Sequence, residues 1–308
     1  MNTDPAVLVG TDGSAAAQAA VRWAATEAVR RNAELIILHA HDESWARLPG
    51  EQGHQPHAAP AVDTVVVDTA RNHAEAVVAD ARTAVQTIAP RLVVHTETVT
   101  GDPALALLRR ATDVGVIVVG HRGRGGFTSL MLGSVSQRLA THAPCPTVVV
   151  RGRDMALSGP VVVGADGSAD GDHVLEAAFA AAAARRAPLL AVHAYAMPLP
   201  VVGYGAPPPV QVDLDELQAA EEQELELLLA PWRAKFPDVA VQTRVTGGGA
   251  ARQLVGASHS AQLVVVGNRG LGVVTGVLLG SVSLQVLHHA DCPVLVSRPV
   301  APTLADRR

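Results

Sequence analysis

The chain has 308 residues, a formal net charge of −5, and 48% hydrophobic residues, of which few are aromatic. At about 150 residues per domain, this length predicts two domains and excludes a single small one. The acidic balance argues against a protein that binds nucleic acid through a general basic field, and it leaves a local basic patch open. No export signal and no run of about 18 uncharged apolar residues is recognisable, so we expect a cytoplasmic protein without a membrane span.

Short apolar runs alternate with Ala-rich stretches of helical composition along the first half of the chain. The predicted strands are 7–9, 35–39, 92–98, 116–119 and 147–150, and the predicted helices are 15–31, 64–88, 103–112 and 134–141. This alternation predicts an α/β fold, an open, five-stranded parallel sheet with helices on both faces. In such sheets ligands bind beyond the carboxyl ends of the strands, near the switch point in strand order.

The second half of the chain repeats the first. The segment VLVGTDGS from Val7 recurs as VVVGADGS from Val161, and VIVVGHRG from Val116 recurs as LVVVGNRG from Leu263. Each copy is about 150 residues long, and repeats of this length are whole domains rather than solenoid units. We therefore expect domains at 1–152 and 160–298, a short linker between them, a second long helix at 213–236, and a disordered tail at 299–308.

A pattern of glycines follows the fourth strand of each copy. It reads Gly-x2-Gly-x9-Gly-Ser in both: Gly120, Gly123, Gly133 and Ser134, then Gly267, Gly270, Gly280 and Ser281. A glycine ending a strand would let a ligand lie against the backbone, and the second glycine would shape the following turn. The Gly-Ser pair begins a helix, whose free amides favour an anion such as phosphate. The alternative is that the glycines only make turns and the serines only cap helices.

An aspartate follows the first strand of each copy, Asp12 in VGTDGS and Asp166 in VGADGS. Both should project at the same sheet edge as the glycines, where a carboxylate can hold a ribose hydroxyl or a metal-bound phosphate. Equally, each aspartate can cap the following helix, with Gly13 or Gly167 making the turn. The sequence leaves both interpretations open.

These motifs, together with the alternating strands and helices, resemble the ATP-binding branch of the universal stress protein family, in its tandem form, over both copies almost end to end. The resemblance implies an ATP site, with Mg²⁺, in each copy, made by the aspartate, the three glycines and the serine named above. It also implies that backbone groups after the second strand, at Ala40 and Ala194, hold the adenine. Val135 and Val282 would offer a further amide to phosphate.

Three functions remain to be distinguished: an ATP-binding signalling module, a slow ATPase, and a scaffold with vestigial sites. The only lysine, Lys235, lies outside any P-loop pattern, which excludes a P-loop NTPase, and no catalytic residue is assigned. Cys145 and Cys292 each precede a proline at the start of an apolar strand, which indicates packing positions and fits a reducing compartment. No spacing of Cys and His predicts a metal site. Family resemblance also implies that the last strands of the two copies pair, giving an intramolecular pseudo-dimer, and allows a homodimer of whole chains.

His39 and His193 close the second strands at equivalent positions, and a structural role is expected for both. Arg122 and Arg269, with Arg124, lie in the glycine loops, where they either reach phosphate or are solvated.

Overall fold

The computed structural model describes residues 5–41, 60–123, 132–153, 158–168, 171–197, 213–270 and 279–298, with no account of side chains at 60–68. It divides into two compact units, which are the two halves of the chain, with the boundary between Met155 and Ala156. The predicted tail at 299–308 and Arg124 lie outside the described residues.

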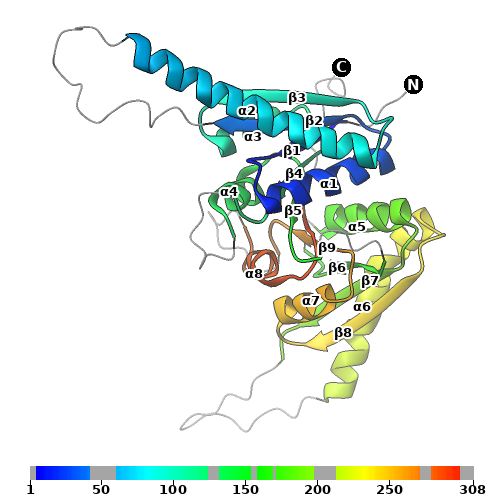
Figure 1. Ribbon diagram of the computed structural model, residues 1–308. Helices are drawn as coiled ribbons and strands as arrows, with labels where there is room; N and C mark the ends of the chain where they lie inside the picture. Colours follow the sequence, from blue (N-terminus) through cyan, green and yellow to red (C-terminus); the bar gives the residue numbers. More distant parts are fainter. Residues whose placement is uncertain are drawn as a thin grey trace, which may run out of the picture. The chain divides into compact units, whose positions relative to one another are not determined.

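The first unit is a parallel sheet in the order β3-β2-β1-β4-β5. Its strands are β1 (Val7–Gly10), β2 (Leu35–His41), β3 (Val94–Thr100), β4 (Val116–Gly120) and β5 (Thr147–Val150). Its helices are α1 (Ala15–Arg30), α2 (Pro60–Ile88), α3 (Pro103–Arg110) and α4 (Ser134–His142) (Figure 1). The predicted fold class is confirmed.

The second unit repeats this arrangement in the order β10-β9-β6-β7-β8. Its strands are β6 (Val161–Gly164), β7 (Leu189–Tyr195), β8 (Val241–Gly247), β9 (Leu263–Gly267) and β10 (Val294–Ser297). Its helices are α5 (Gly171–Arg185), α6 (Leu214–Lys235), α7 (Ala250–Ser258) and α8 (Ser281–His289). Like β1, β6 lies centrally and pairs with the second and fourth strands of its unit, which are β7 and β9.

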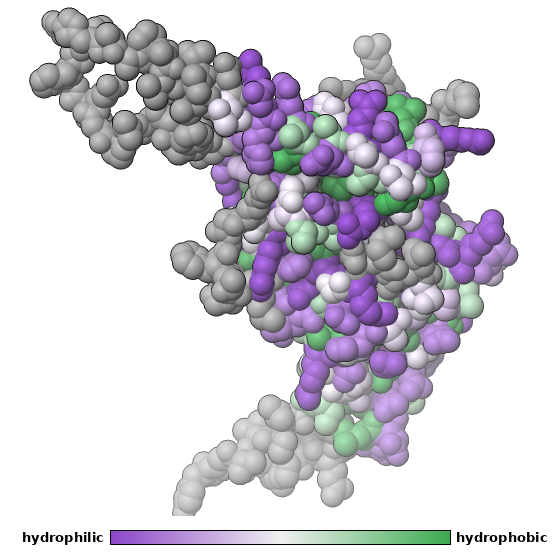
Figure 2. Space-filling model, in the orientation of Figure 1, coloured by the Kyte–Doolittle hydropathy of each residue, from purple (hydrophilic) through white to green (hydrophobic). Residues whose placement is uncertain are grey.

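The central strands are aliphatic because both of their faces are covered. Leu8 pairs in register with Ile36 on one side and with Ile117 on the other, and all three residues are buried. In contrast, the edge strand β3 carries Thr, His and Glu side chains that are largely exposed. Polar side chains protect such an edge from pairing with other chains. In Figure 2 hydrophilic residues cover most of the visible described surface, in keeping with an apolar interior.

The strand order creates a switch point between β1 and β4. The chain moves outward from β1 through β2 to β3, then returns to β4 and continues to β5 on the other side. Because parallel crossovers are right-handed, this reversal places α1 and α2 on one face and α3 and α4 on the other. Chain segments that leave β1 and β4 therefore diverge at their carboxyl ends, which opens a crevice there.

Several predicted boundaries were wrong by a few residues. Strand β2 runs on to His41, so Ala40 lies within the strand rather than just after it, and β3 is shifted to end at Thr100. All seven residues of β2 pair with β3, so this ladder, which local composition does not reveal, sets both limits. Helix α2 begins at Pro60 rather than at residue 64, because proline fits the first helical position, where its missing N–H is not needed.

Candidate functional site

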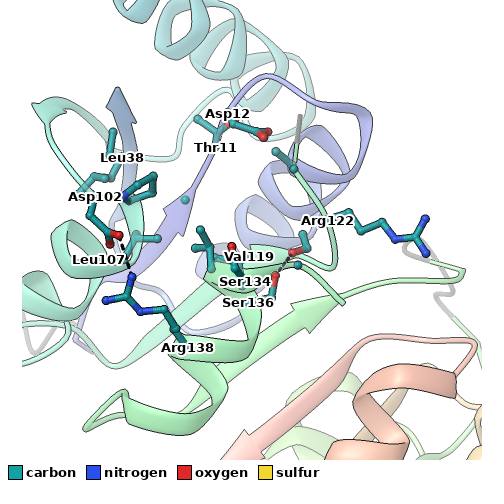
Figure 3. Close-up of a pocket in the computed structure, with 18 of the residues that line it drawn as sticks. Thr11, Asp12, Leu38, Asp102, Leu107, Val119, Arg122, Ser134, Ser136 and Arg138 are labelled. Carbon is teal, nitrogen blue, oxygen red and sulfur yellow. Dashed lines mark hydrogen bonds and ion pairs between the residues drawn. The ribbon is translucent and has the colours of Figure 1, made fainter. Parts of the chain in front are cut away.

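A cavity of about 530 Å³ lies at the switch point of the first unit. This volume falls within the range of small-molecule sites, roughly 300–1,000 Å³. Figure 3 shows that its lining comes from the ends of the central strands and from the first turns of α3 and α4. All the residues predicted for the first copy line it: Asp12, Ala40, Gly120, Gly123, Gly133, Ser134 and Val135. Tertiary structure thus gathers into one cavity segments that are more than 100 positions apart in the chain.

Asp12 does not cap the helix that follows it. The N-cap of α1 is Ser14, whose Oγ accepts the amide of Ala17 at 3.2 Å, while Oδ1 of Asp12 accepts the amide of Ser14 at 2.9 Å. The helix-cap interpretation of Asp12 is therefore wrong, because the serine two residues later takes that role. Gly13 does make the turn, with a φ of 77° in the left-handed region. The carboxylate of Asp12 therefore lies just beyond the carboxyl end of β1, on the wall of the cavity (Figure 3).

Gly120, the last residue of β4, and Gly123 both make room for another part of the chain. Gly120 leaves room for a helix: a Cβ there would lie 2.5 Å from the carbonyl oxygen of Ala16 in the first turn of α1. Gly123 has no left-handed backbone angle and is not required by a turn. A Cβ on Gly123 would instead lie 2.5 Å from Oδ2 of Asp12, so its missing side chain makes space for that carboxylate.

Helix α4 begins without a side-chain cap. Its N-cap is Gly133, whose amide donates to the carbonyl of His121 at 2.7 Å, and Ser134 is the first helical residue. The N-cap interpretation of Ser134 is therefore wrong. Ser136 fixes the helix start, since its Oγ donates to the carbonyl of Gly120 at 2.7 Å. First-turn amides and the positive end of the helix dipole face the cavity, where they favour an anion.

The second unit reproduces the contacts of the aspartate and of the fourth helix, whereas a Cβ on Gly267 would lie 2.8 Å from the carbonyl oxygen of Arg269 rather than against α5 backbone. Asp166 accepts the amide of Ser168 at 3.0 Å, and a Cβ on Gly270 would lie 2.6 Å from Oδ2 of Asp166. The start of α8 matches that of α4, with Gly280 as the N-cap and Ser281 and Val282 as the first helical residues. Ser283 donates to the carbonyl of Gly267 at 2.6 Å. Ala194 lies near the end of β7, as Ala40 does in β2.

An ion pair that the sequence does not predict lies on the cavity wall. Arg138 in α4 donates to Oδ2 of Asp102 at 2.7 Å, and Oδ1 of Asp102 accepts the amide of Leu105 at the start of α3. The Leu105 amide has the largest effect and lowers the pKa of Asp102; burial, the next largest, opposes it, and Arg138 lowers the pKa further. The only signal in the sequence is that Arg138 lies one turn after Ser134 on α4. The second copy has Gly249 and Gln285 at the corresponding positions.

Apolar side chains that sequence reasoning also missed form the floor of the cavity. They are Leu38, Leu107, Val119 and Leu132. Nothing in the sequence separates them from ordinary core residues, because a side chain that lines an apolar cavity has the same composition and periodicity as one that fills the core.

The loop after β4 carries His121 and Arg122. Burial, followed by the charges of Arg151 and Arg122, lowers the pKa of His121, so its ring is neutral at pH 7. Arg122 lines the cavity, but Figure 3 shows its guanidinium pointing away from the other lining residues. Arg269 has the equivalent place in the second unit.

No cluster of metal-ligating side chains occurs among the described residues. Within the same part of the chain, no helix is long and apolar enough to cross a membrane.

The fold and its glycine-lined cavity define a tandem protein of two doubly wound α/β domains, with a candidate ligand site at the switch point of the sheet. The model of the universal stress protein family matches residues 5–151 and 158–298. The chain belongs to the universal stress protein family.

Relatives and solved structures agree with this assignment. Universal stress protein Rv2005c of Mycobacterium tuberculosis is 36% identical over 312 residues, which cover 95% of this chain and 96% of the relative. Universal stress protein Rv2623 of the same organism is 35% identical over 307 residues, covering 96% and 97%. The crystal structure of a universal stress protein from Archaeoglobus fulgidus covers 96% of this chain and 98% of its own, with a TM-score of 0.67 and 19% identity, a likeness of fold alone.

Proposed function

We propose that each domain binds ATP, accompanied by Mg²⁺, and that the chain works as a nucleotide-dependent signalling module of the stress response. The observation that carries this proposal is the cavity at the switch point, whose lining includes a carboxylate, the uncapped start of α4 and a glycine beside each. A nucleotide presents matching chemistry, because it combines an anionic phosphate chain with ribose hydroxyls and a flat, mostly apolar base.

Each part of the nucleotide has a place in the cavity. The phosphates lie at the start of α4, where the amides of Ser134 and Val135 donate to them. Asp12 accepts a ribose hydroxyl. The base lies against Leu38 and the end of β2, with the backbone of Ala40 at its edge.

Binding rather than rapid catalysis fits the side chains around the cavity. Phosphoryl transfer needs a positioned nucleophile or water and a cation that stabilises the transferring group. In the cavity, Arg122 points away from the other lining residues, and Arg138 is held by Asp102. Slow hydrolysis of ATP is the second candidate, and a scaffold with vestigial sites is the third.

We also propose a location and an assembly for the protein. It works in the cytoplasm, and the last strands of its two halves, β5 and β10, pair as an intramolecular pseudo-dimer. Such pairing would remove two exposed sheet edges from solvent. The same proposal allows a homodimer of whole chains.

The test is to denature freshly purified protein and to identify and count the released nucleotide by mass spectrometry. The expected result is about two adenine nucleotides per chain, with Asp12→Ala and Asp166→Ala each removing about one. The form released also separates ATP from ADP and from a cyclic nucleotide. If no nucleotide is released and calorimetry detects no binding of added Mg·ATP, the proposal is wrong and the scaffold interpretation stands.

A further inference from the structure

Two buried histidines hold the backbone just before the site aspartates. Nδ1 of His39, in β2, lies 2.7 Å from the carbonyl oxygen of Thr11, and Nδ1 of His193, in β7, lies 2.8 Å from that of Ala165. Both rings are buried. Because a carbonyl oxygen only accepts, Nδ1 carries the proton in both rings. Each histidine therefore ties the end of the second strand to the residue that precedes Asp12 or Asp166.

The second ring nitrogen meets different partners in the two domains. In the second domain, Nε2 of His193 lies 2.8 Å from Oε2 of Glu221 in α6. Since an ionised carboxylate only accepts, this contact holds a second proton between the ring and Glu221. A proton at Nε2 of His193 is thus hydrogen-bonded and faces a countercharge.

Around His39 in the first domain, the described titratable groups are two imidazoles and one carboxylate. Three described titratable groups act on it: His41 in β2, His73 in α2, and Asp12 beyond β1. His41 lies almost parallel to it, with ring centroids 6.2 Å apart. Burial lowers the pKa of His39 most, the carbonyl of Thr11 opposes this, and His41 and His73 lower it further. A second proton on His39 would therefore be buried, and both His41 and His73 oppose it.

Protonation there acts on the wall of the site. His39 and His41 flank Ala40, which lines the cavity, and α2 packs against β2. Because His41 and His73 both oppose a proton on His39, its protonation favours a looser contact between α2 and the end of β2. A ligand that needs this wall in place binds less tightly to such a state.

We propose that His39 and His193 are positioning residues for the nucleotide sites, and that acid weakens the first site while sparing the second. This inference rests on the proposed function. It makes the two sites of one chain unequal, so that acidification leaves the second domain loaded and empties the first.

The experiment measures each site separately in the full chain. Asp166→Ala leaves only the first site, and Asp12→Ala leaves only the second. For each variant the affinity for Mg·ATP is measured by calorimetry at about pH 7.5 and at about pH 5.5. From about pH 7.5 to about pH 5.5 the first site should lose about threefold to tenfold in affinity, and the second less than about threefold. ATP itself takes up a proton over this range, but it does so for both sites alike, so the difference between them reports the protein. Equal losses at the two sites would overturn the proposal.

Substitutions on the long helices α2 and α6 test the role of the neighbouring side chains. His73→Glu gives His39 a carboxylate on α2, and the acid-induced loss at the first site should shrink to less than about threefold. Glu221→His should create such a loss at the second site. His39→Gln keeps an N–H donor but cannot titrate. In this variant the affinity of the first site for Mg·ATP should change with pH no more than the affinity of the second site does. A loss that persists in His73→Glu would contradict the inference.

A measurement without nucleotide separates this inference from the proposed function. Imidazole ¹⁵N spectra of the full chain follow the protonation of His39 directly, and His73→Glu should raise its pKa. If no ATP binds but this shift is seen, the proposed function fails and the electrostatic difference stands. If His73→Glu leaves the titration of His39 unchanged, the proposal is wrong whether or not ATP binds.

Discussion

Gly123 lies directly against the carboxylate of Asp12. A Cβ on this glycine would stand 2.5 Å from Oδ2 of the aspartate, and the same relationship joins Gly270 to Asp166 at 2.6 Å. The second glycine of the pattern and the strand-terminal aspartate, which look independent in the sequence, therefore form one structural unit in each domain.

Gly123→Ala should abolish the geometry of the first site without unfolding the domain. The new methyl group must push the Asp12 carboxylate aside, because real Cβ atoms do not approach an oxygen so closely. We expect a loss of about tenfold or more in ATP affinity at the first site, a difference of about 1.4 kcal/mol. Calorimetry on a background of Asp166→Ala measures it. Unchanged affinity would show that the position of Asp12 does not matter for binding.

Gly256→Ala is the matched control, because this glycine in α7 has nothing within 4 Å of the position of a Cβ. Replacing an exposed helical glycine by alanine reduces the entropy of the unfolded chain, so the free energy of unfolding should rise by about 0.5 kcal/mol. Denaturant titration of the full chain tests this, and ATP binding at both sites should be unaffected. A decrease in stability would show that the space beside Gly256 is not open.

Gly120→Ala should act on stability rather than on ligand contact. Its methyl group would meet the carbonyl of Ala16 at 2.5 Å, and backbone cannot rotate away as a side chain can. Helix α1 must shift on the sheet, which we expect to cost about 1–3 kcal/mol of unfolding free energy. Hydrogen exchange should show the loss in β1, β4 and α1 and not in the second domain. If protection is retained while affinity alone falls, the first turn of α1 is not what excludes a side chain at this position.

Acid should destabilise the first domain. The pKa values of His39 and His121 are both lowered in the folded state, mainly by burial, whereas an unfolded chain takes up these protons from about pH 6.5 downward. Their stabilising contribution is therefore fully present above about pH 6.5 and is lost as the pH falls toward the lowered values. Hydrogen exchange of β1 and β2 at about pH 7 and about pH 5.5, corrected for the intrinsic exchange rate, measures it.

His121→Asn provides the control for this effect, since Asn268 occupies the same position in the second domain. This variant should keep only the part of the acid sensitivity that is due to His39. An acid response equal to that of the unsubstituted chain would mean that His121 does not contribute.

The sequence by itself determined the architecture and the location of the site. Short aliphatic runs that alternate with helical stretches specify a parallel sheet, because both of its faces must be buried, and the two copies of the pattern specify two domains. The spacing of Gly120, Gly123 and Gly133, with Asp12 after the first strand, was enough to predict residues that all line one cavity. Such motifs can be recognised in the sequence because each depends on a short stretch of chain.

Only the tertiary structure decided what these residues do there. The need for glycine at 120 comes from Ala16, the need for glycine at 123 comes from Asp12, and the cap of α1 is Ser14. The apolar floor, the Asp102–Arg138 pair and the different surroundings of His39 and His193 were likewise not predictable. Each of these features is a distance between segments far apart in the chain, and such distances are set by how strands and helices pack rather than by any local pattern of residues.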